Sequence, residues 1–499
     1  MTEDEASGDP PVASAANRLA AEIRRRRNAA KLSQRKLAEM SGYTAAYISM
    51  AESPNRRPSR ELVRALDRVL GADGALTTLW DLAKADRRTL RHTLLSATGP
   101  AQLPEIASTF TLDYLKFELV DAGRFGISAP AGRFFSGSTI SATSYRAVDD
   151  ERIVVRVPTD LTDDAALRRL GRSLVVGTAV GPSGPRLFGL DNRAARIRLA
   201  KAVDGAPLLI PDAYELDDLT LGVLWAVANL DDALLDDDSA LAAAEQHLRA
   251  LDSSTPSTGG PDLAADLTAV SRMWLGSDFC ARHILRHAND LQNVPVFWTR
   301  EQRGEESSTW LLFAHKYTYL ARTAATFDAA DAKLTRTFCI PPETVTGSPR
   351  PERILLLLTV ALMESFGIEV QVCGEPEYSA VAGFALDQRR RAIVANWVGY
   401  DGIWQVDVTD ERPILREFAD AHGYANAHSM IAGPTPYDRL RALADYLDLD
   451  WAWVTRRCAD LGEYGTAGLA QPRSRLLSTT GLDEACRFLG TFGEQPPEH

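Results

Sequence analysis

The sequence has few of the residues and motifs that secreted proteins and many enzymes need. Its 499 residues include only five cysteines and no C-x-x-C pair, which argues against zinc ribbons and dithiol redox motifs. No G-x-x-x-x-G-K-[ST] or G-x-G-x-x-G phosphate loop occurs, and no G-x-S-x-G turn. We therefore expect a protein of the reducing cytoplasm that is not an enzyme and holds no cofactor.

Long apolar segments are also missing. The longest run, residues 354–363, lies between Arg353 and Glu364. It is far shorter than the roughly 20 residues that span a bilayer. Residues 1–16 are acidic and contain no apolar stretch of the kind that secretory signals have. We expect no membrane contact and a disordered leader at residues 1–16.

Excess positive charge is confined to one part of the chain. The formal net charge is −12, but residues 17–92 hold 17 Lys and Arg against 8 Asp and Glu, a net of +9. The residues after 92 carry a net of −17. Because nucleic acids are polyanions, we expect any contact with them to lie within residues 17–92.

Residues 17–92 show the spacing of short packed helices. We predict helices at 34–40, 44–52 and 60–70, with Ser33 as the N-cap of the first. Gly42 falls where a tight turn between two helices needs a residue that tolerates positive φ. Two short helices joined by such a turn form a helix-turn-helix.

The motif Leu32-Ser33-Gln34-x-x-Leu37-Ala38-x-x-x-Gly42-x-x-x-x-x-Ile48-Ser49-x-x-Glu52, followed by Pro58-Ser59, Leu62 and Leu66, resembles a known family. It is similar to the DNA-binding domain of XRE (Cro/C1 repressor-type) transcriptional regulators, and it covers about the first sixth of the chain. The resemblance implies an all-α, lambda-repressor-like domain whose recognition helix, 44–52, enters the major groove of double-stranded DNA.

The resemblance also implies which residues contact DNA. It places Gln34 at a phosphate or a neighbouring base, and it places bases opposite Ala45, Ala46 and Ser49 in the helix that Thr44 caps. Phosphate contacts suit Arg35, Asn55, Arg56, Arg57 and Arg60. Alanine methyl groups cannot make the paired hydrogen bonds that identify a base. We therefore expect specificity to depend on Gln34, Ser49 and DNA shape.

The rest of the chain mixes strands and helices. We predict a mixed α/β middle region at 93–252, a linker rich in Ser, Thr, Pro and Gly at 253–262, and a C-terminal α/β region at 263–499. The last region should contain a buried helix at 352–366 followed by strands. The acidic run 231–238 predicts a solvated helix junction. The fold class is multidomain, predominantly α, with an α/β or α+β part.

Two patterns in the C-terminal region suggest sites. Cys280, His283 and His287 would share one face of a helix and could bind zinc, but they also fit a structural helix and lack a fourth ligand, so no metal is assigned. The polar segment 299–306 and the aromatic stretch 310–319, which contains His315 and Lys316, fit either a ligand pocket or an amphipathic helix beside a solvated loop.

These patterns together favour a DNA-binding transcriptional regulator. A single helix-turn-helix reads few base pairs, so we expect a homodimer whose large C-terminal part supplies the dimer contact. The same part would sense a small-molecule effector or a partner protein. Two alternatives stay open. One is a DNA-tethered enzyme or metal-binding protein, and the other is an adaptor whose acidic part binds a partner protein.

Overall fold

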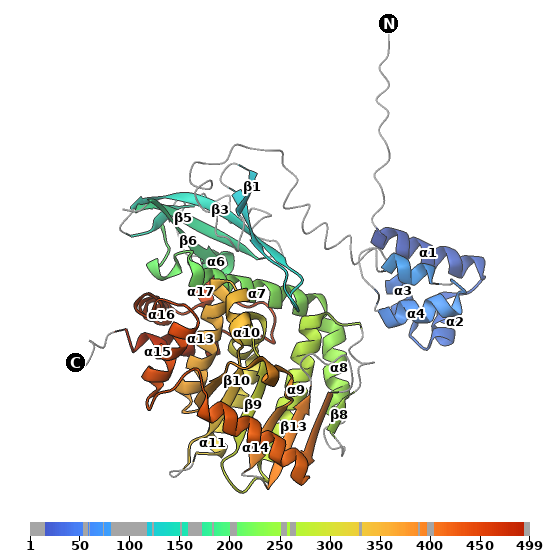
Figure 1. The fold of residues 1–499 in the computed structure, drawn as a ribbon. Coiled ribbons are helices and arrows are strands. Elements are labelled where there is room, and N and C mark those ends of the chain that lie inside the picture. The colour runs from blue at the N-terminus through green and yellow to red at the C-terminus, as the bar shows by residue number, and fades with distance from the viewer. Residues whose placement is uncertain are drawn as a thin grey trace. The chain divides into compact units, whose positions relative to one another are not determined.

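The chain divides into two compact units, residues 1–99 and 100–499, which we call the head and the body (Figure 1). The head is helical, whereas the body combines helices with two mixed β-sheets. The predicted fold class is therefore confirmed. The computed structural model describes residues 15–52, 58, 60–72, 74–80, 117–121, 124–149, 152–157, 172–181, 184–199, 207–250, 257–259, 266–328, 332–387, 390–396 and 404–493.

The head is a set of short helices around its own hydrophobic core. Its helices are α1 (Ala15–Ala29), α2 (Gln34–Ser41), α3 (Ala45–Ala51) and α4 (Arg60–Val69), and residues 75–80 are also helical. Ser33 caps α2 as expected, since its side chain accepts a hydrogen bond from the Lys36 N–H at 3.1 Å. The core includes Ile23, Leu37 and Ile48, each 0% exposed. These side chains come from α1, α2 and α3, so the three helices share one hydrophobic core, as in a small domain.

The first sheet of the body has the order β1-β2-β3-β4-β7, with β5 beside β3 and β6 beside β5. The β3–β5 pair is parallel and the other pairs are antiparallel. Helix α7 packs against β2 and β3 of this sheet. The strands are β1 (Phe117–Asp121), β2 (Arg124–Ala129), β3 (Ser138–Asp149), β4 (Val154–Arg156), β5 (Ser173–Gly181), β6 (Gly184–Asp191) and β7 (Pro207–Leu209).

The second sheet has the order β11-β10-β9-β12-β13-β14-β8. Strands β9, β10 and β11 are parallel to one another, and the remaining pairs are antiparallel. The edge strand β8 lies inside the predicted linker 253–262, which therefore contributes to the sheet. The strands are β8 (Ser257–Gly259), β9 (Val296–Glu301), β10 (Thr335–Cys339), β11 (Glu369–Cys373), β12 (Gly383–Asp387), β13 (Arg391–Asn396) and β14 (Trp404–Thr409).

Helices fill the space around the two sheets. The predicted buried helix is α13, whose residues 354–364 are all buried. No helix within the described ranges is both long and apolar enough to cross a membrane. The helices are α6 (Asn192–Leu199), α7 (Asp218–Asp236), α8 (Asp238–Ala250), α9 (Ala269–Ala288), α10 (Gly304–Leu312), α11 (Ala314–Thr326), α12 (Pro342–Gly347), α13 (Arg350–Ser365), α14 (Arg412–Ala427), α15 (Pro436–Tyr446), α16 (Trp451–Tyr464), α17 (Ala467–Ala470) and α18 (Thr480–Gly490).

One hydrophobic cluster joins the two parts of the body that the sequence suggested as separate regions. It contains residues of the first sheet, such as Ile127 and Val176, together with residues of the second sheet, such as Val370 and Ile393. Each of these four side chains is 0% exposed. The segments 93–252 and 263–499 therefore share a core.

The acidic run at 231–238 forms the junction between α7 and α8, as expected, but it is solvated only in part: Asp236 and Asp238 are exposed, whereas Asp231 and Asp237 are buried. The Asp231 carboxylate is buried, 2.7 Å from a guanidinium nitrogen of Arg172, and it accepts backbone N–H groups of Arg473 and Ser474. Asp237 is buried too and accepts the Thr268 N–H at 2.6 Å. Buried carboxylates need such donors, and here the donors come from distant segments of the chain.

Candidate nucleic-acid interface

The turn between α2 and α3 depends on Gly42. Its φ is 78°, in the left-handed region, and its N–H donates to the Ala38 carbonyl at the end of α2. A Cβ added to Gly42 would meet nothing within 4 Å, so the glycine is needed for backbone conformation and not for space. The turn lies between the end of α2 at Ser41 and the start of α3 at Ala45, three residues after Gly42.

Helix α3 has one buried face and one exposed face. Ile48 and Ala51 are buried, and Ile48 shares the head core with Leu37 of α2. Ala45 and Ser49 are exposed on the opposite side, one helical turn apart. The second helix of the motif is thus held by its apolar residues, while small side chains face outward.

A buried carboxylate fixes the end of α3 to the two preceding helices. Glu52 is 2% exposed, and the Arg27 guanidinium of α1 donates to its two carboxylate oxygens at 2.5 and 3.1 Å. Gln34 of α2 donates its side-chain N–H to the same carboxylate at 2.8 Å. The hydrogen bond to Glu52 raises the pKa of Arg27. Because Glu52 holds partners from α1 and α2, it sets the position of α3 relative to both.

The role of Glu52 was not foreseen from the sequence, where it appeared only as part of the motif. The sequence feature that could have indicated this role is an acidic residue at the end of a helix in a strongly basic part of the chain. Glu52 matters because it is buried: a buried carboxylate without a partner destabilises the fold, whereas one with charged hydrogen-bond donors holds those donors in fixed positions.

The structure describes some of the predicted DNA contacts in full. The Arg35 side chain is 88% exposed and lies 3.7 Å from Glu39, a loose pair on the surface of α2. Thr44, like Ala45 and Ser49, is exposed. Gln34 donates one amide N–H to Glu52, and its side chain carries a second N–H and a carbonyl oxygen that could bond to a further partner.

The structure describes the remaining predicted contact residues only in part or not at all. Ala46 belongs to α3 and Arg60 begins α4, but nothing is described of their side chains. Asn55, Arg56 and Arg57 lie outside the described residues. The DNA-contact role of all ten predicted residues remains a prediction.

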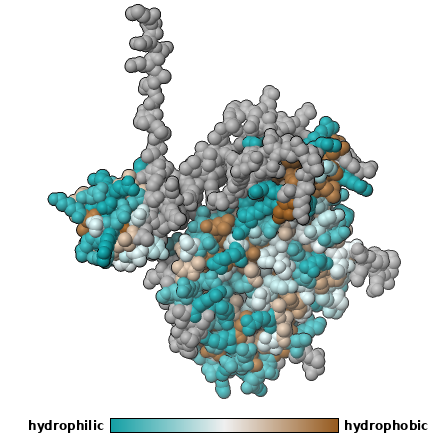
Figure 2. All heavy atoms as spheres, turned by 180° about the vertical axis from the view of Figure 1, so that it is seen from behind, coloured by the Kyte–Doolittle hydropathy of each residue, from teal (hydrophilic) through white to brown (hydrophobic). Residues whose placement is uncertain are grey.

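The surface of the head suits a polar partner. Most residues on the visible face of the head, at the left of Figure 2, are hydrophilic. On α1, Glu22 accepts hydrogen bonds from Arg25 and Arg26, which lower its pKa to about 2. That pairing neutralises only part of the positive charge of this helix.

The cysteine and histidines suggested as metal ligands all lie on α9. Cys280 and His283 are buried, with the His283 ring 4.3 Å from the Phe279 ring, while His287 is half-buried beside Arg286. Burial raises the pKa of the Cys280 thiol and favours its neutral form. In the described part of the chain, no three His, Cys, Asp or Glu side chains converge as a metal site would require.

Comparison with known proteins bears on the head alone. Residues 18–80 match a family model described as a helix-turn-helix domain. No curated protein and no solved structure is significantly similar to the chain. The match spans the α2–turn–α3 unit described above and indicates DNA binding. Residues 18–80 form a helix-turn-helix domain.

Proposed function

We propose that the protein is a sequence-specific transcriptional regulator of the XRE type that works in the cytoplasm as a homodimer. In this proposal the head reads the major groove of DNA. The body is not catalytic, and it provides the dimer contact and senses an effector or partner. The observation that carries the proposal is the exposed face of α3, with Thr44, Ala45 and Ser49, held in place by the buried Glu52 network.

The shape of that face suits the major groove. Its side chains are small, so the α3 backbone can approach the base edges closely, and the Ser49 hydroxyl can donate or accept a hydrogen bond. Arg35 extends from the start of α2, where phosphate oxygens lie in this mode of binding. The net charge of +9 on residues 17–92 supplies the sequence-independent attraction.

The dimer follows from how little DNA one such unit reads. Two heads bound to half-sites about 34 Å apart would double the contact and require a two-fold symmetric operator. The net charge of −17 after residue 92 makes the body unsuited to DNA, which supports a role in pairing the heads and responding to a ligand.

Selection of genomic DNA by the full-length protein tests this proposal. The comparison is with the double variant Gln34→Ala, Ser49→Ala at one fixed salt concentration, and Thr78→Ala, an exposed change in the same unit, is the matched control. We expect a short two-fold symmetric site that the wild type and the control enrich and the double variant does not.

Other outcomes would contradict separate parts of the proposal. An enriched site without symmetry would contradict the dimer. Failure to enrich any site at low salt would contradict sequence-specific binding. Equal enrichment by the double variant would contradict the assignment of Gln34 and Ser49 as base-reading residues.

A further inference from the structure

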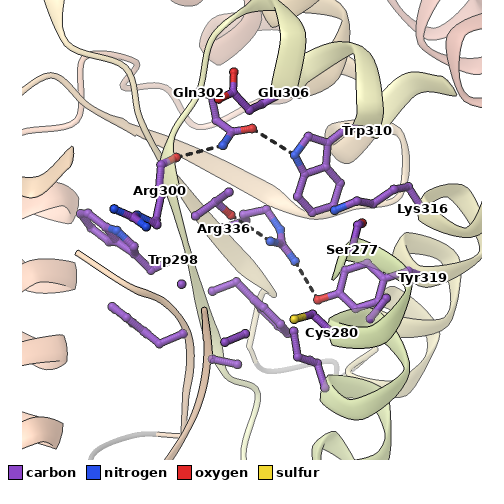
Figure 3. Close-up of a pocket in the computed structure, with 18 of the residues that line it drawn as sticks. Ser277, Cys280, Trp298, Arg300, Gln302, Glu306, Trp310, Lys316, Tyr319 and Arg336 are labelled. Carbon is purple, nitrogen blue, oxygen red and sulfur yellow. Dashed lines mark hydrogen bonds between the residues drawn. The ribbon is translucent and has the colours of Figure 1, made fainter. Parts of the chain in front are cut away.

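The body contains a pocket between the second sheet and helices α9, α10 and α11 (Figure 3). It holds about 760 Å³ of space without protein atoms, a volume that includes open solvent at its mouth. Its walls are largely apolar and include Ile284, Phe297, Trp298, Phe384 and Ile393. The pocket joins the two segments, 299–306 and 310–319, that the sequence left open as pocket or surface.

Three cationic side chains line the pocket, of which Arg300 is half-buried and the other two are buried. Arg336 of β10 and Lys316 of α11 line the pocket, and each is 4% exposed. The Lys316 ammonium lies 3.5 Å from the centre of the Trp310 ring, and the Arg336 guanidinium lies 4.6 Å from that of Phe297. Aromatic faces attract cations but do not neutralise their charge.

The hydrogen-bond partners of Arg336 are neutral. Its two terminal nitrogens donate to the Thr299 hydroxyl at 3.0 Å and to the Tyr319 hydroxyl at 3.3 Å (Figure 3). Its Nε is buried and has no hydrogen-bond acceptor. Within the described residues, Arg336 forms no ion pair. A buried guanidinium of this kind normally has a carboxylate beside it.

The acidic side chain that lines the pocket is already engaged. Glu306 pairs with Arg133 and also accepts the Arg303 backbone N–H at the start of α10. In Figure 3 its carboxylate lies beyond Gln302, away from Arg336 and Lys316. Within the described residues, no carboxylate therefore balances the charge of Arg336.

The groups around Lys316 make its charge costly. Burial and the neighbouring Arg336 lower the pKa of Lys316 to about 7. Cys280 of α9 interacts with Lys316, but burial raises the pKa of this thiol and favours its neutral form. Next to Lys316 on α11, His315 is half-buried, and loss of hydration holds its pKa well below its ordinary value, so it is neutral. An anion placed between Lys316 and Arg336 would relieve their repulsion and their loss of hydration.

We propose that this pocket binds a small aromatic carboxylate. Its carboxylate would accept hydrogen bonds from the Arg336 Nε and the Lys316 ammonium, and its ring would lie against the apolar wall formed by Phe297, Phe384 and Ile393. An aromatic carboxylate fits better than inorganic phosphate, because its ring can cover the apolar wall, whereas a phosphate has no apolar part to place there. The inference concerns binding by the body and does not depend on DNA binding by the head.

Calorimetric titration of the full-length protein tests the proposal without DNA. The probes are benzoate and indole-3-acetate, their neutral amides, and inorganic phosphate. We expect at least one carboxylate to bind more tightly than its amide and more tightly than phosphate. Binding of an amide as tightly as its acid, preferred binding of phosphate, or no binding of either acid at millimolar concentration would overturn the proposal.

Substitutions connect the binding to this pocket. Arg336→Gln and Lys316→Met should each weaken binding of the carboxylate about 10- to 100-fold, as expected for loss of a charged hydrogen bond. Lys333→Gln, an exposed change on the approach to β10, should leave it unchanged. Lys316→Met removes a buried charge and is expected to fold, so unchanged affinity in this variant would refute the assignment.

Proton uptake provides a readout that a purely structural lysine would not give. At pH 8 the Lys316 amine is largely neutral, and a bound carboxylate should raise its pKa and draw in up to about one proton. The binding enthalpy should then vary with the ionisation enthalpy of the buffer in the wild type and not in Lys316→Met. The same buffer dependence in both proteins would show that Lys316 does not contact the anion.

Discussion

Replacing Glu52 with glutamine should destabilise the head far more than an equivalent change at its surface. Glutamine keeps the size of the side chain but removes the negative charge from a position whose side chain is 1% exposed. The Arg27 guanidinium, only 14% exposed, would lose its counter-ion. In addition, the new amide N–H group would face donors on Arg27 and Gln34, so one hydrogen bond would become a repulsive contact.

The size of the effect follows from the burial of the pair. Removal of one partner from a buried ion pair costs about 3–5 kcal/mol. A domain the size of the head has a free energy of unfolding of roughly 3–10 kcal/mol. At about 4–8 °C per kcal/mol for a domain of this size, we expect the midpoint of thermal unfolding to fall by about 12 °C or more.

The assay uses the single tryptophan of residues 1–99. Trp80 is 7% exposed and its indole N–H donates to the Pro58 carbonyl at 2.9 Å, so its fluorescence should report unfolding of the head core. Urea titration of the 1–99 fragment then gives the free energy of unfolding for the wild type and each variant.

Glu22→Gln is the matched control. Glu22 also accepts from two arginines, Arg25 and Arg26, but its side chain is 20% exposed and the pairs lie along one helix. Pairs of this kind contribute less than about 1 kcal/mol. Similar losses in the two variants, or a loss below about 1 kcal/mol for Glu52→Gln, would refute the argument that burial of the Glu52 network holds α3 in place.

Three further predictions concern the body, the turn and the DNA contact. The pKa of Lys316 is about 7 in the folded state and 10.5 ordinarily. Burial of the charged amine therefore lowers the free energy of unfolding by its full amount below pH 7, and this loss of stability disappears as pH rises towards 10.5. Lys316→Met should therefore stabilise the body by on the order of 2 kcal/mol at pH 7 after loss of the Trp310 contact, and by much less at pH 10, in denaturant titrations. Gly42→Ala should cost the head about 1 kcal/mol in urea titration and Gly42→Asn less, because a Cβ is disfavoured at a φ of 78°. Arg35→Ala should weaken binding to selected and random DNA equally and reduce the salt slope by about 1, whereas a loss confined to the selected site would show that Arg35 reads a base.

Sequence reasoning worked where structure is decided locally. Ser33 and Gly42 were identified as the cap and the turn because each acts on backbone groups within a few residues. The buried helix α13 was predicted from its continuous apolar residues, 354–363. Such features depend on side chains that are close together in the chain.

Prediction from the sequence failed where a residue's structural partner is distant in the sequence. The sequence predicts a solvated acid at Asp231, because its buried partner, Arg172, lies 59 positions earlier in the chain. Strand β9 was not predicted, because Thr299, Arg300 and Glu301 make half of it polar although it lies inside the second sheet between β10 and β12. Thr299 and Arg300 line the pocket, so the departure from an apolar strand pattern coincides with the proposed binding site.

The division of α3 into a buried and an exposed face has a consequence for how this protein could evolve. Ala45 and Ser49 are exposed on the side away from the head core, so replacing them should change the free energy of unfolding by no more than about 0.5 kcal/mol. Ile48 and Glu52, which hold the helix, have no such freedom. If the protein is the regulator proposed above, its operator preference can therefore drift through single substitutions while the domain stays folded, and duplicated copies can acquire new target genes without first becoming more stable.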